Sequence, residues 1–138
     1  MKFKNLLFLL LSSILSATAA FAQQEGKTVY AFGYATCLGD STVYLSTIQP
    51  LDSAVVKSKS GFLEHRHEYA VQMEQALAAQ YNRYFTCAIF FAEDVKKLEK
   101  QYTKICHHLE KEGDRKLQKL PLTTFRFSPI TDPTIVSH

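Results

Sequence analysis

Residues 28–48 read TVYAFGYATCLGDSTVYLSTI and decide the fold. This stretch is rich in β-branched and aromatic residues and is interrupted once, by Gly39-Asp40. It therefore predicts two strands joined by a tight type II′ turn with glycine at the first central position. The turn would pair Leu38 with Ser41 and fix the register. The pairs expected on one face are Thr36 with Val43, Tyr34 with Leu45 and Phe32 with Thr47, and those on the other are Ala35 with Tyr44, Gly33 with Ser46 and Ala31 with Ile48. We assign the first, bulkier face to the core and expect the second to be semi-exposed.

Two later stretches have the periodicity of amphipathic helices. Apolar side chains recur at intervals of three and four over residues 69–84, and Asn82 is expected to end this first helix. The second helix is expected to begin around Glu93 and Asp94, whose negative charges suit the positive end of a helix, and to stop at Gly113. The apolar stripe of the second helix consists of Val95, Leu98, Tyr102, Ile105 and Leu109.

Two further strands are predicted downstream of the hairpin. Residues 86–91, TCAIFF, are apolar at both alternating positions, which is typical of a central strand covered on both faces. Residues 122–127 carry Phe125 and Phe127 at alternating positions, as in a strand with one buried face. Residues 128–138 are expected to form a loose tail.

The predicted order of elements is β-β-α-β-α-β, which corresponds to an α+β fold. We expect a two-layer sandwich in which a mixed four-stranded sheet carries two helices on one face. Right-handed crossovers favour a sheet in which the first strand lies between the second and the third, with the fourth outside the third. In this order the second strand, residues 42–48, is an open edge through which a homo-oligomer would form.

The first 22 residues, MKFKNLLFLLLSSILSATAAFA, have the layout of a secretory signal peptide. Two lysines precede an apolar run, and Ala20 and Ala22 provide the small residues that a signal peptidase requires. The apolar run of about ten residues is half of what a bilayer span needs. We therefore expect residues 1–22 to be removed, residues 23–138 to form a single domain, and the protein to be exported to the periplasm or outside the cell.

The charge of the chain argues against nucleic acid as a partner. The formal net charge is +3, and removal of residues 1–22 with their two lysines lowers it by two. Proteins that bind nucleic acid normally gather a marked positive excess on one face. The densest basic stretch contains Lys96, Lys97, Lys100 and Lys104 and is interleaved with Glu93, Asp94 and Glu99, which is typical of a solvated helix face.

Three cysteines remain after the predicted processing, namely Cys37, Cys87 and Cys106. An exported protein meets an oxidising environment, and Cys37 and Cys87 would lie at the same end of the sheet if their strands are antiparallel neighbours. A disulfide between them is therefore one prediction, and small buried free thiols are the other. Cys106 is followed by His107 and His108. Adjacent residues of a helix point about 100° apart, so neither imidazole is expected to lie beside the Cys106 sulfur.

A metal site would need histidines that share a face. His65 and His67 do so only if their segment is extended, and neither this pair nor His107 and His108 has the spacing of two ligands on a helix. The chain also has no GxSxG elbow, no glycine-rich phosphate loop and no paired carboxylates suited to glycosidic chemistry. We therefore predict no catalytic residue, no metal and no cofactor.

The hairpin VYAFGYATCLGDSTVYLSTIQ, the later TCAIFFAEDVKKLEKQY and the closing TTFRF resemble small exported α+β proteins of Bacteroidetes. The resemblance covers nearly all of the chain after residue 22. It implies export and an envelope or extracellular setting, and it brings no catalytic or ligand motif.

Together these features predict an exported, non-catalytic binding or interaction module with a protein, peptide or glycan partner and no membrane span. The alternative is a small thiol- or metal-dependent periplasmic enzyme that uses Cys87 or the pair His65 and His67. The two hypotheses differ in whether these groups converge in one crevice.

Overall fold

The computed structural model describes residues 27–130 and confirms the α+β class. The predicted signal peptide and residues 131–138 of the predicted tail lie outside the described residues. The elements are β1 (Val29–Cys37), β2 (Thr42–Ser46), β3 (Gln49–Leu51), α2 (Arg66–Tyr81), β4 (Phe85–Ala92), α3 (Val95–Glu112) and β5 (Lys116–Leu120). The predicted order of strands and helices along the chain is confirmed, with the short β3 added after β2.

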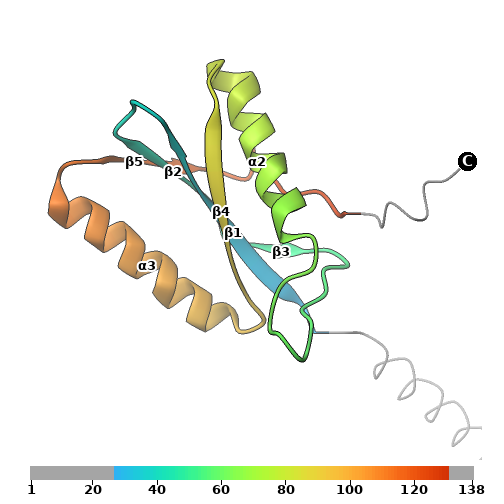
Figure 1. Ribbon diagram of the computed structural model, residues 1–138. Coiled ribbons are helices and arrows are strands. Elements are labelled where there is room, and N and C mark those ends of the chain that lie inside the picture. The colour runs from blue at the N-terminus through green and yellow to red at the C-terminus, as the bar shows by residue number, and fades with distance from the viewer. Residues whose placement is uncertain (1–26, 131–138) are drawn as a thin grey trace, which may run out of the picture.

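The strand β1 is the centre of a mixed sheet (Figure 1). β4 pairs with it antiparallel along one side, from Tyr30 opposite Ala92 to Cys37 opposite Phe85. On the other side, β2 pairs antiparallel with the second half of β1, and β3 pairs with the first half. β5 extends the sheet beyond β2 in parallel orientation. The four main strands therefore lie in the order β4-β1-β2-β5.

The predicted hairpin register is confirmed where β1 and β2 pair, as in Tyr34 opposite Leu45. Nearer the start of β1, Ala31 pairs with Gln49 and not with Ile48 as predicted. The chain from β2 to β3 thus contains one more residue than the stretch of β1 that it faces. Such an extra residue is a β-bulge, which bends the strand locally and separates β3 from β2.

The hairpin turn closes one residue earlier than predicted. Asp40 N–H donates to Cys37 O at 3.1 Å, so Leu38 and Gly39 are the central residues. Gly39 has a φ of +84° at the second central position, which matches a type II turn and not type II′. Glycine serves in either turn because it adopts positive φ at little cost.

The predicted last strand is wrong, because residues 122–127 form no strand. β5 instead lies earlier in the chain and pairs with β2. Three of its five side chains are polar and exposed, so it lacks the apolar alternation that predicts a strand. Phe125 and Phe127 are buried as predicted, but in a segment without regular structure. β2, predicted to be an open edge, is therefore an interior strand. Among the described strands, β4 and β5 lie at the two edges of the sheet, and the short β3 pairs with β1 alone.

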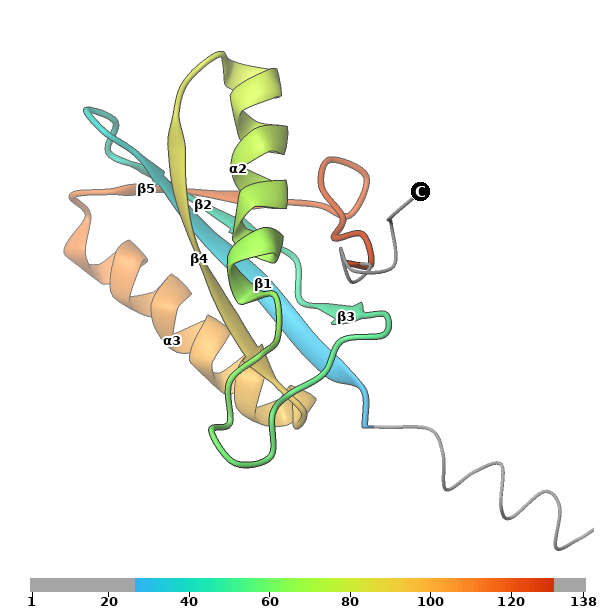
Figure 2. The ribbon, with the colours of Figure 1, turned by 45° about the vertical axis from the view of Figure 1, so that its right-hand side comes forward.

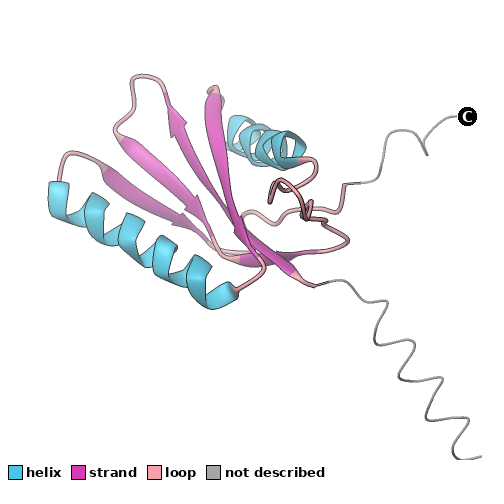
Figure 3. Ribbon diagram, turned by 60° about the horizontal axis from the view of Figure 1, so that its bottom comes forward, coloured by secondary structure: helices cyan, strands magenta, loops and turns pink. Residues whose placement is uncertain are grey.

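The two helices pack on opposite faces of the sheet, and not on one face as predicted (Figure 3). Phe32, Val43 and Leu45 pack with α3, whereas Ala35 and Tyr44 pack with α2. The strand order explains this, since crossover connections are right-handed. The connection from β2 to β4 through α2 crosses the sheet in one direction, and the connection from β4 to β5 through α3 crosses back. Right-handed connections in opposite directions place their helices on opposite sides.

Both faces of the central strands are therefore buried, including the face predicted to be semi-exposed. Tyr44 on that face is 6% exposed and packs against Tyr81 and Phe85. On the α3 face, Phe32 is fully buried and stacks on Phe90 with 5.0 Å between ring centres. Aromatic pairs of this kind add about 0.5–1.5 kcal/mol each to the stability that their buried area provides.

The helix ends follow the predicted capping residues. α2 ends before Asn82, which adopts the left-handed conformation. α3 begins after Asp94, whose side chain accepts a hydrogen bond from Lys96 N–H at 3.0 Å, and ends before Gly113 with a φ of +67°. Among residues 27–130, no helix combines the length and the apolar character needed to cross a bilayer.

The C-terminal segment is held against α2. Phe127 N–H donates to Oε1 of the buried Gln49 at 2.7 Å. Ser128 exchanges two hydrogen bonds of 2.9 Å with the Gln72 side chain on α2. The start of the predicted loose tail is thus fixed, on the side of α2 that faces away from β4 (Figure 2).

Candidate functional site

Cys37 and Cys87 lie on neighbouring antiparallel strands, which is the arrangement that the predicted disulfide requires. Their positions are offset, however, because Cys37 is opposite Phe85 and Cys87 is opposite Ala35. Diagonal positions of this kind are about 7–8 Å apart, beyond the usual Cα separation of a disulfide. All three cysteines are free in the structure, so the predicted bridge would require the strands to slide. A thiol count on unreduced protein tests that prediction.

The Cys87 side chain packs against α2 and is a poor nucleophile. Its Sγ lies 3.5 Å from Met73 Sδ. Burial, together with the nearby Glu74 carboxylate, raises the pKa of this thiol to about 12. The thiolate is the reactive form of cysteine, so Cys87 is suited to packing and not to nucleophilic catalysis.

The residues around Cys106 do not form a catalytic group. Cys106 is a buried residue of α3, and burial raises the pKa of its thiol. His107 and His108 are exposed, and His108 Nε2 lies 3.1 Å from Glu112 Oε1. Within the part of the chain that the structure describes, no hydrogen bond joins Cys106 to either histidine.

His65 and His67 do not lie in an extended segment. His65 is the residue that precedes α2, with a φ of 60°, and its Nδ1 lies 3.9 Å from Glu68 Oε1. His67 is exposed in the first turn of α2. Over residues 27–130, no group of three or more His, Cys, Asp or Glu side chains is arranged to hold a metal ion. The helical turn thus separates the two candidate ligands, because residues two positions apart on a helix do not face each other.

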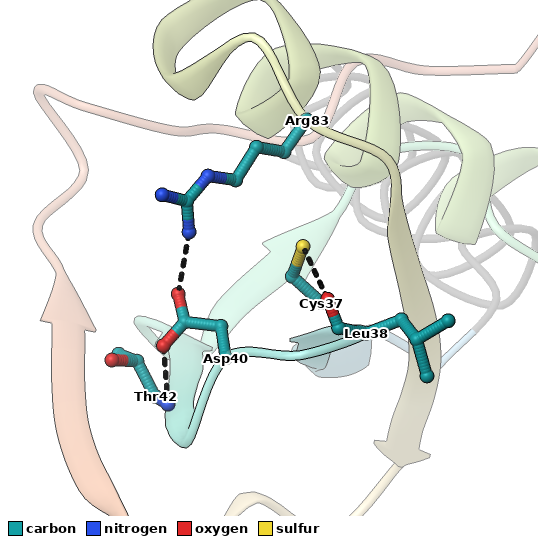
Figure 4. A network of polar contacts seen from close by, with 5 residues as sticks. All are labelled: Cys37, Leu38, Asp40, Thr42 and Arg83. Carbon is teal, nitrogen blue, oxygen red and sulfur yellow. Dashed lines mark hydrogen bonds and ion pairs between the residues drawn. The ribbon is translucent and has the colours of Figure 1, made fainter.

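Polar contacts join the tip of the β1–β2 hairpin to the connection between α2 and β4 (Figure 4). Asp40 accepts a hydrogen bond from Thr42 N–H at 2.9 Å with one carboxylate oxygen and pairs with Arg83 at 3.2 Å with the other. The hydrogen bonds from Thr42 and the charge of Arg83 lower the pKa of Asp40. Cys37 Sγ contacts Leu38 O at 3.7 Å. Both charged groups already have a partner, so this network fixes the turn and offers no free charge to a ligand.

The second half of α3 and the adjoining sheet enclose an open apolar groove of about 650 Å³, which we call the α3–β4 groove. Its lining residues are Tyr34 of β1, Ala88 and Phe90 of β4, and Lys104, Ile105, His108 and Leu109 of α3. α3 leaves this face of β4 partly open, since Ala88 is exposed and Phe90 is only half-buried. His108 is engaged by Glu112, whereas Lys104 has no ion-pair partner among the described residues. Lys104 is therefore the free charge of the groove.

The strand β4 borders this groove and is an edge strand, not the central strand that was predicted. Among residues 27–130 it pairs with β1 alone. Its eight residues, FTCAIFFA, contain no charge and no proline. Sheets normally protect their edges with charges, prolines or short length. The other edge, β5, follows that rule, because it has five residues that include Lys116 and Lys119.

Two side chains of α2 protect part of the β4 edge. Glu74 Oε1 accepts a hydrogen bond from Cys87 N–H at 3.0 Å, and Arg66 Nη2 donates to Ile89 O at 2.9 Å. The Arg66 guanidinium also lies 5.5 Å from the centre of the Phe91 ring. These bonds occupy backbone groups that an added strand would otherwise use.

Sequence reasoning missed the groove and the edge. The composition of β4 indicated a strand, but a covered central strand and an uncharged edge strand have the same composition. One signal was present, since Ala88 is a small residue among aromatic ones and leaves room above the sheet. The meaning of this small residue can be recognised only when the strands that pair with β4 are known.

Comparisons of the chain with protein-family models, with curated proteins and with solved structures found no match. The groove and the β4 edge are therefore the features from which the function is inferred.

Proposed function

We propose that this protein is an exported, non-catalytic binding module that recognises a peptide or protein segment at the α3–β4 groove. The apolar groove beside an uncharged edge strand carries the proposal. Binding sites are typically concave and mostly apolar, with a few polar groups that orient the ligand. Lys104 provides such a group. Export is proposed from residues 1–22, which have the layout of a signal peptide.

A peptide suits this groove better than a glycan. The walls present Phe90, Ile105 and Leu109, with few hydrogen-bonding groups. A glycan carries many hydroxyls, and burying them without hydrogen bonds is costly. An extended peptide can instead satisfy its polar backbone on the edge of a sheet, which is an established mode of recognition.

The thiol- or metal-dependent enzyme has less support. The pKa of Cys87 is raised to about 12, which opposes a nucleophilic role. His65 and His67 lie at the start of α2, whereas the groove is formed by α3 and β4. Neither group contributes to the groove.

Selection of a phage-displayed peptide library on the purified protein tests the proposal, with affinities then measured for synthetic copies of the selected peptides. Ala88→Glu places a charge in the groove at an exposed position and should weaken their binding tenfold or more. Ala79→Glu is the matched control, because it makes the same change at an exposed position of α2. It should leave binding unchanged, and circular dichroism checks that both variants fold.

Selected peptides that bind Ala88→Glu as tightly as the parent protein would place recognition elsewhere and contradict the proposal. A selection that enriches no peptide would contradict it as well.

A further inference from the structure

The alternation of an antiparallel strand determines which backbone groups of β4 face away from the sheet. Alternate residues direct both N–H and C=O toward the same neighbour. Cys87 N–H and Ile89 O bond to side chains of α2, so the odd-numbered residues of β4 face outward. Gly33 of β1, which lies opposite Ile89, fits this alternation. Its N–H points away from β4 and donates to Ser46 Oγ of β2 at 2.7 Å.

The two α2 side chains leave a pair of backbone groups between them. Along the edge, the outward groups follow in the order Cys87 N–H, Cys87 O, Ile89 N–H and Ile89 O. Glu74 binds the first of these groups and Arg66 binds the last. The middle two, Cys87 O and Ile89 N–H, face outward without a partner from the described residues.

A parallel strand would use this middle pair. In a parallel ladder, one residue donates its N–H to the residue before its opposite neighbour and accepts from the residue after it. The residue opposite Ala88 would therefore bond to Cys87 O and Ile89 N–H. An antiparallel strand would reach the same two groups through the two residues that flank the one opposite Ala88. The second backbone group of each flanking residue would then face Cys87 N–H or Ile89 O, which Glu74 and Arg66 already hold.

The same register directs a ligand side chain into the groove. Residues opposite each other in neighbouring strands place their side chains on the same face of the sheet. The Ala88 side chain lines the groove, so a residue opposite Ala88 would enter the groove beside it, near Phe90 and Ile105. The free backbone pair and the groove thus converge on a single residue of the ligand.

The flank of α3 beside the groove is basic. Lys97 and Lys104 lie seven residues apart, which is about two turns along one face of the helix. Neither has an ion-pair partner in the described part of the chain. Because α3 begins shortly after β4 ends, Lys97 lies toward the Ala92 end of β4. A parallel peptide runs toward that end, so acidic residues on its C-terminal side would approach the two lysines.

We propose that β4 binds, in parallel orientation, an extended peptide in which a leucine-sized apolar residue is followed by acidic residues. The apolar residue donates its N–H to Cys87 O, accepts a hydrogen bond from Ile89 N–H and places its side chain in the groove. The acidic residues face Lys97 and Lys104. This inference rests on the proposed function and specifies the ligand and its direction.

A second copy of the chain is a poorer occupant of this edge. Two copies of β4 related by a two-fold axis perpendicular to the sheet would pair antiparallel. Such pairing would bring backbone groups of one copy against Cys87 N–H and Ile89 O of the other, where they would compete with Glu74 and Arg66, whereas the parallel peptide leaves both hydrogen bonds intact.

Fluorescence polarisation with synthetic probes tests the binding mode. The probe is an N-terminally labelled peptide of sequence Thr-Val-Thr-Leu-Thr-Asp-Asp, used with the parent protein. Methylation of the leucine nitrogen removes the donor to Cys87 O and should weaken binding tenfold or more. Methylation of the next nitrogen is the matched control, because that N–H points away from β4 in a parallel ladder. It should change the Kd less than threefold.

A second probe, with the two aspartates moved to the N-terminus, tests the direction. It should bind at least fivefold more weakly than the first probe. Lys104→Glu should abolish this difference, whereas Lys111→Glu, at the end of α3 and outside the groove, should preserve it.

Equal sensitivity to both methylations would overturn the parallel register, and so would equal affinity for the two probes. Peptides selected from the library that depend on Ala88, together with an acidic probe that fails to bind at about 1 mM, would overturn this inference and leave the proposed function standing. Loss of Ala88 dependence in the selected peptides themselves would overturn both.

Discussion

Gly33→Ala tests the close packing of α2 on β1. A Cβ at Gly33 would clash with Met73 Sδ and would lie 3.1 Å from Cys87 Sγ. Met73 is 0% exposed, so its thioether cannot turn aside into solvent. The added methyl group must therefore push α2 away from the sheet or force Met73 into a poorer rotamer.

Two opposing effects set the size of the change in the free energy of unfolding. Overpacking of a well-packed core costs about 1–3 kcal/mol. Alanine in a strand gains about 0.5–1 kcal/mol over glycine, because glycine loses more backbone freedom on folding. The clash dominates because it involves a fully buried side chain, so we expect a net loss of about 1–2 kcal/mol. In a domain of this size, each kcal/mol lowers the melting temperature by about 4–8 °C.

Urea unfolding followed by circular dichroism measures this loss. The substitution is repeated in a Met73→Ala background, which itself costs about 2–5 kcal/mol and serves as the reference. There, Gly33→Ala should be neutral or stabilising, because the thioether that it meets is absent. An equal loss in both backgrounds, or a loss below about 0.5 kcal/mol in the parent protein, would refute the close approach of α2 to β1.

Three further predictions concern the Cys87 thiol, the β4 edge and the predicted signal peptide. Burial raises the pKa of Cys87 to about 12, so above about pH 9 the unfolded chain loses this proton while the folded chain keeps it. The free energy of unfolding should then fall by up to about 1.4 kcal/mol per pH unit, and urea titrations should show a shallower fall for Cys87→Ala; identical slopes would contradict the buried thiol. Arg66→Ala combined with Glu74→Ala exposes the β4 edge and should cause self-association in sedimentation experiments, whereas Glu68→Ala should not. A double variant that sediments like the parent protein would show that these side chains do not protect the edge. N-terminal sequencing of the protein from the cell envelope or medium should begin at Gln23, and an unprocessed cytosolic chain would disprove export.

The features that depend on local sequence were predictable. The hairpin register over Tyr34 and Leu45 was correct because the alternation of apolar residues and a glycine turn act within a few residues. The C-terminal ends of both helices and the start of α3 were correct for the same reason, since Asn82, Asp94 and Gly113 act through capping geometry. α2 begins three residues before the predicted apolar pattern, because His65 precedes it without a side-chain cap.

The strand order was not predictable, because β5 is an edge strand with exposed polar side chains and no apolar alternation. The apolar alternation predicted a strand at residues 122–127 instead, where Phe125 and Phe127 are buried without forming a strand. The prediction of the last strand at residues 122–127 placed that strand on the wrong side of the sheet. It also reversed the second crossover and so placed both helices on one face.

The candidate site could not be predicted without the strand order. The groove exists because β4 is an edge and because α3 lies on the face opposite α2, so neither Ala88 nor Lys104 could be singled out before β5 was placed. The residues that did attract attention, His65, His67 and Cys87, have packing or solvent-exposed positions that leave them outside the groove.

Chemical-shift mapping of a library-selected peptide on ¹⁵N-labelled protein tests most directly whether the groove is the binding site. We expect the largest shifts at Ala88, Ile89 and Ile105, with little change along β5. Shifts confined to β5 or to the hairpin tip around Asp40, with the amides of β4 unmoved, would contradict recognition at this groove.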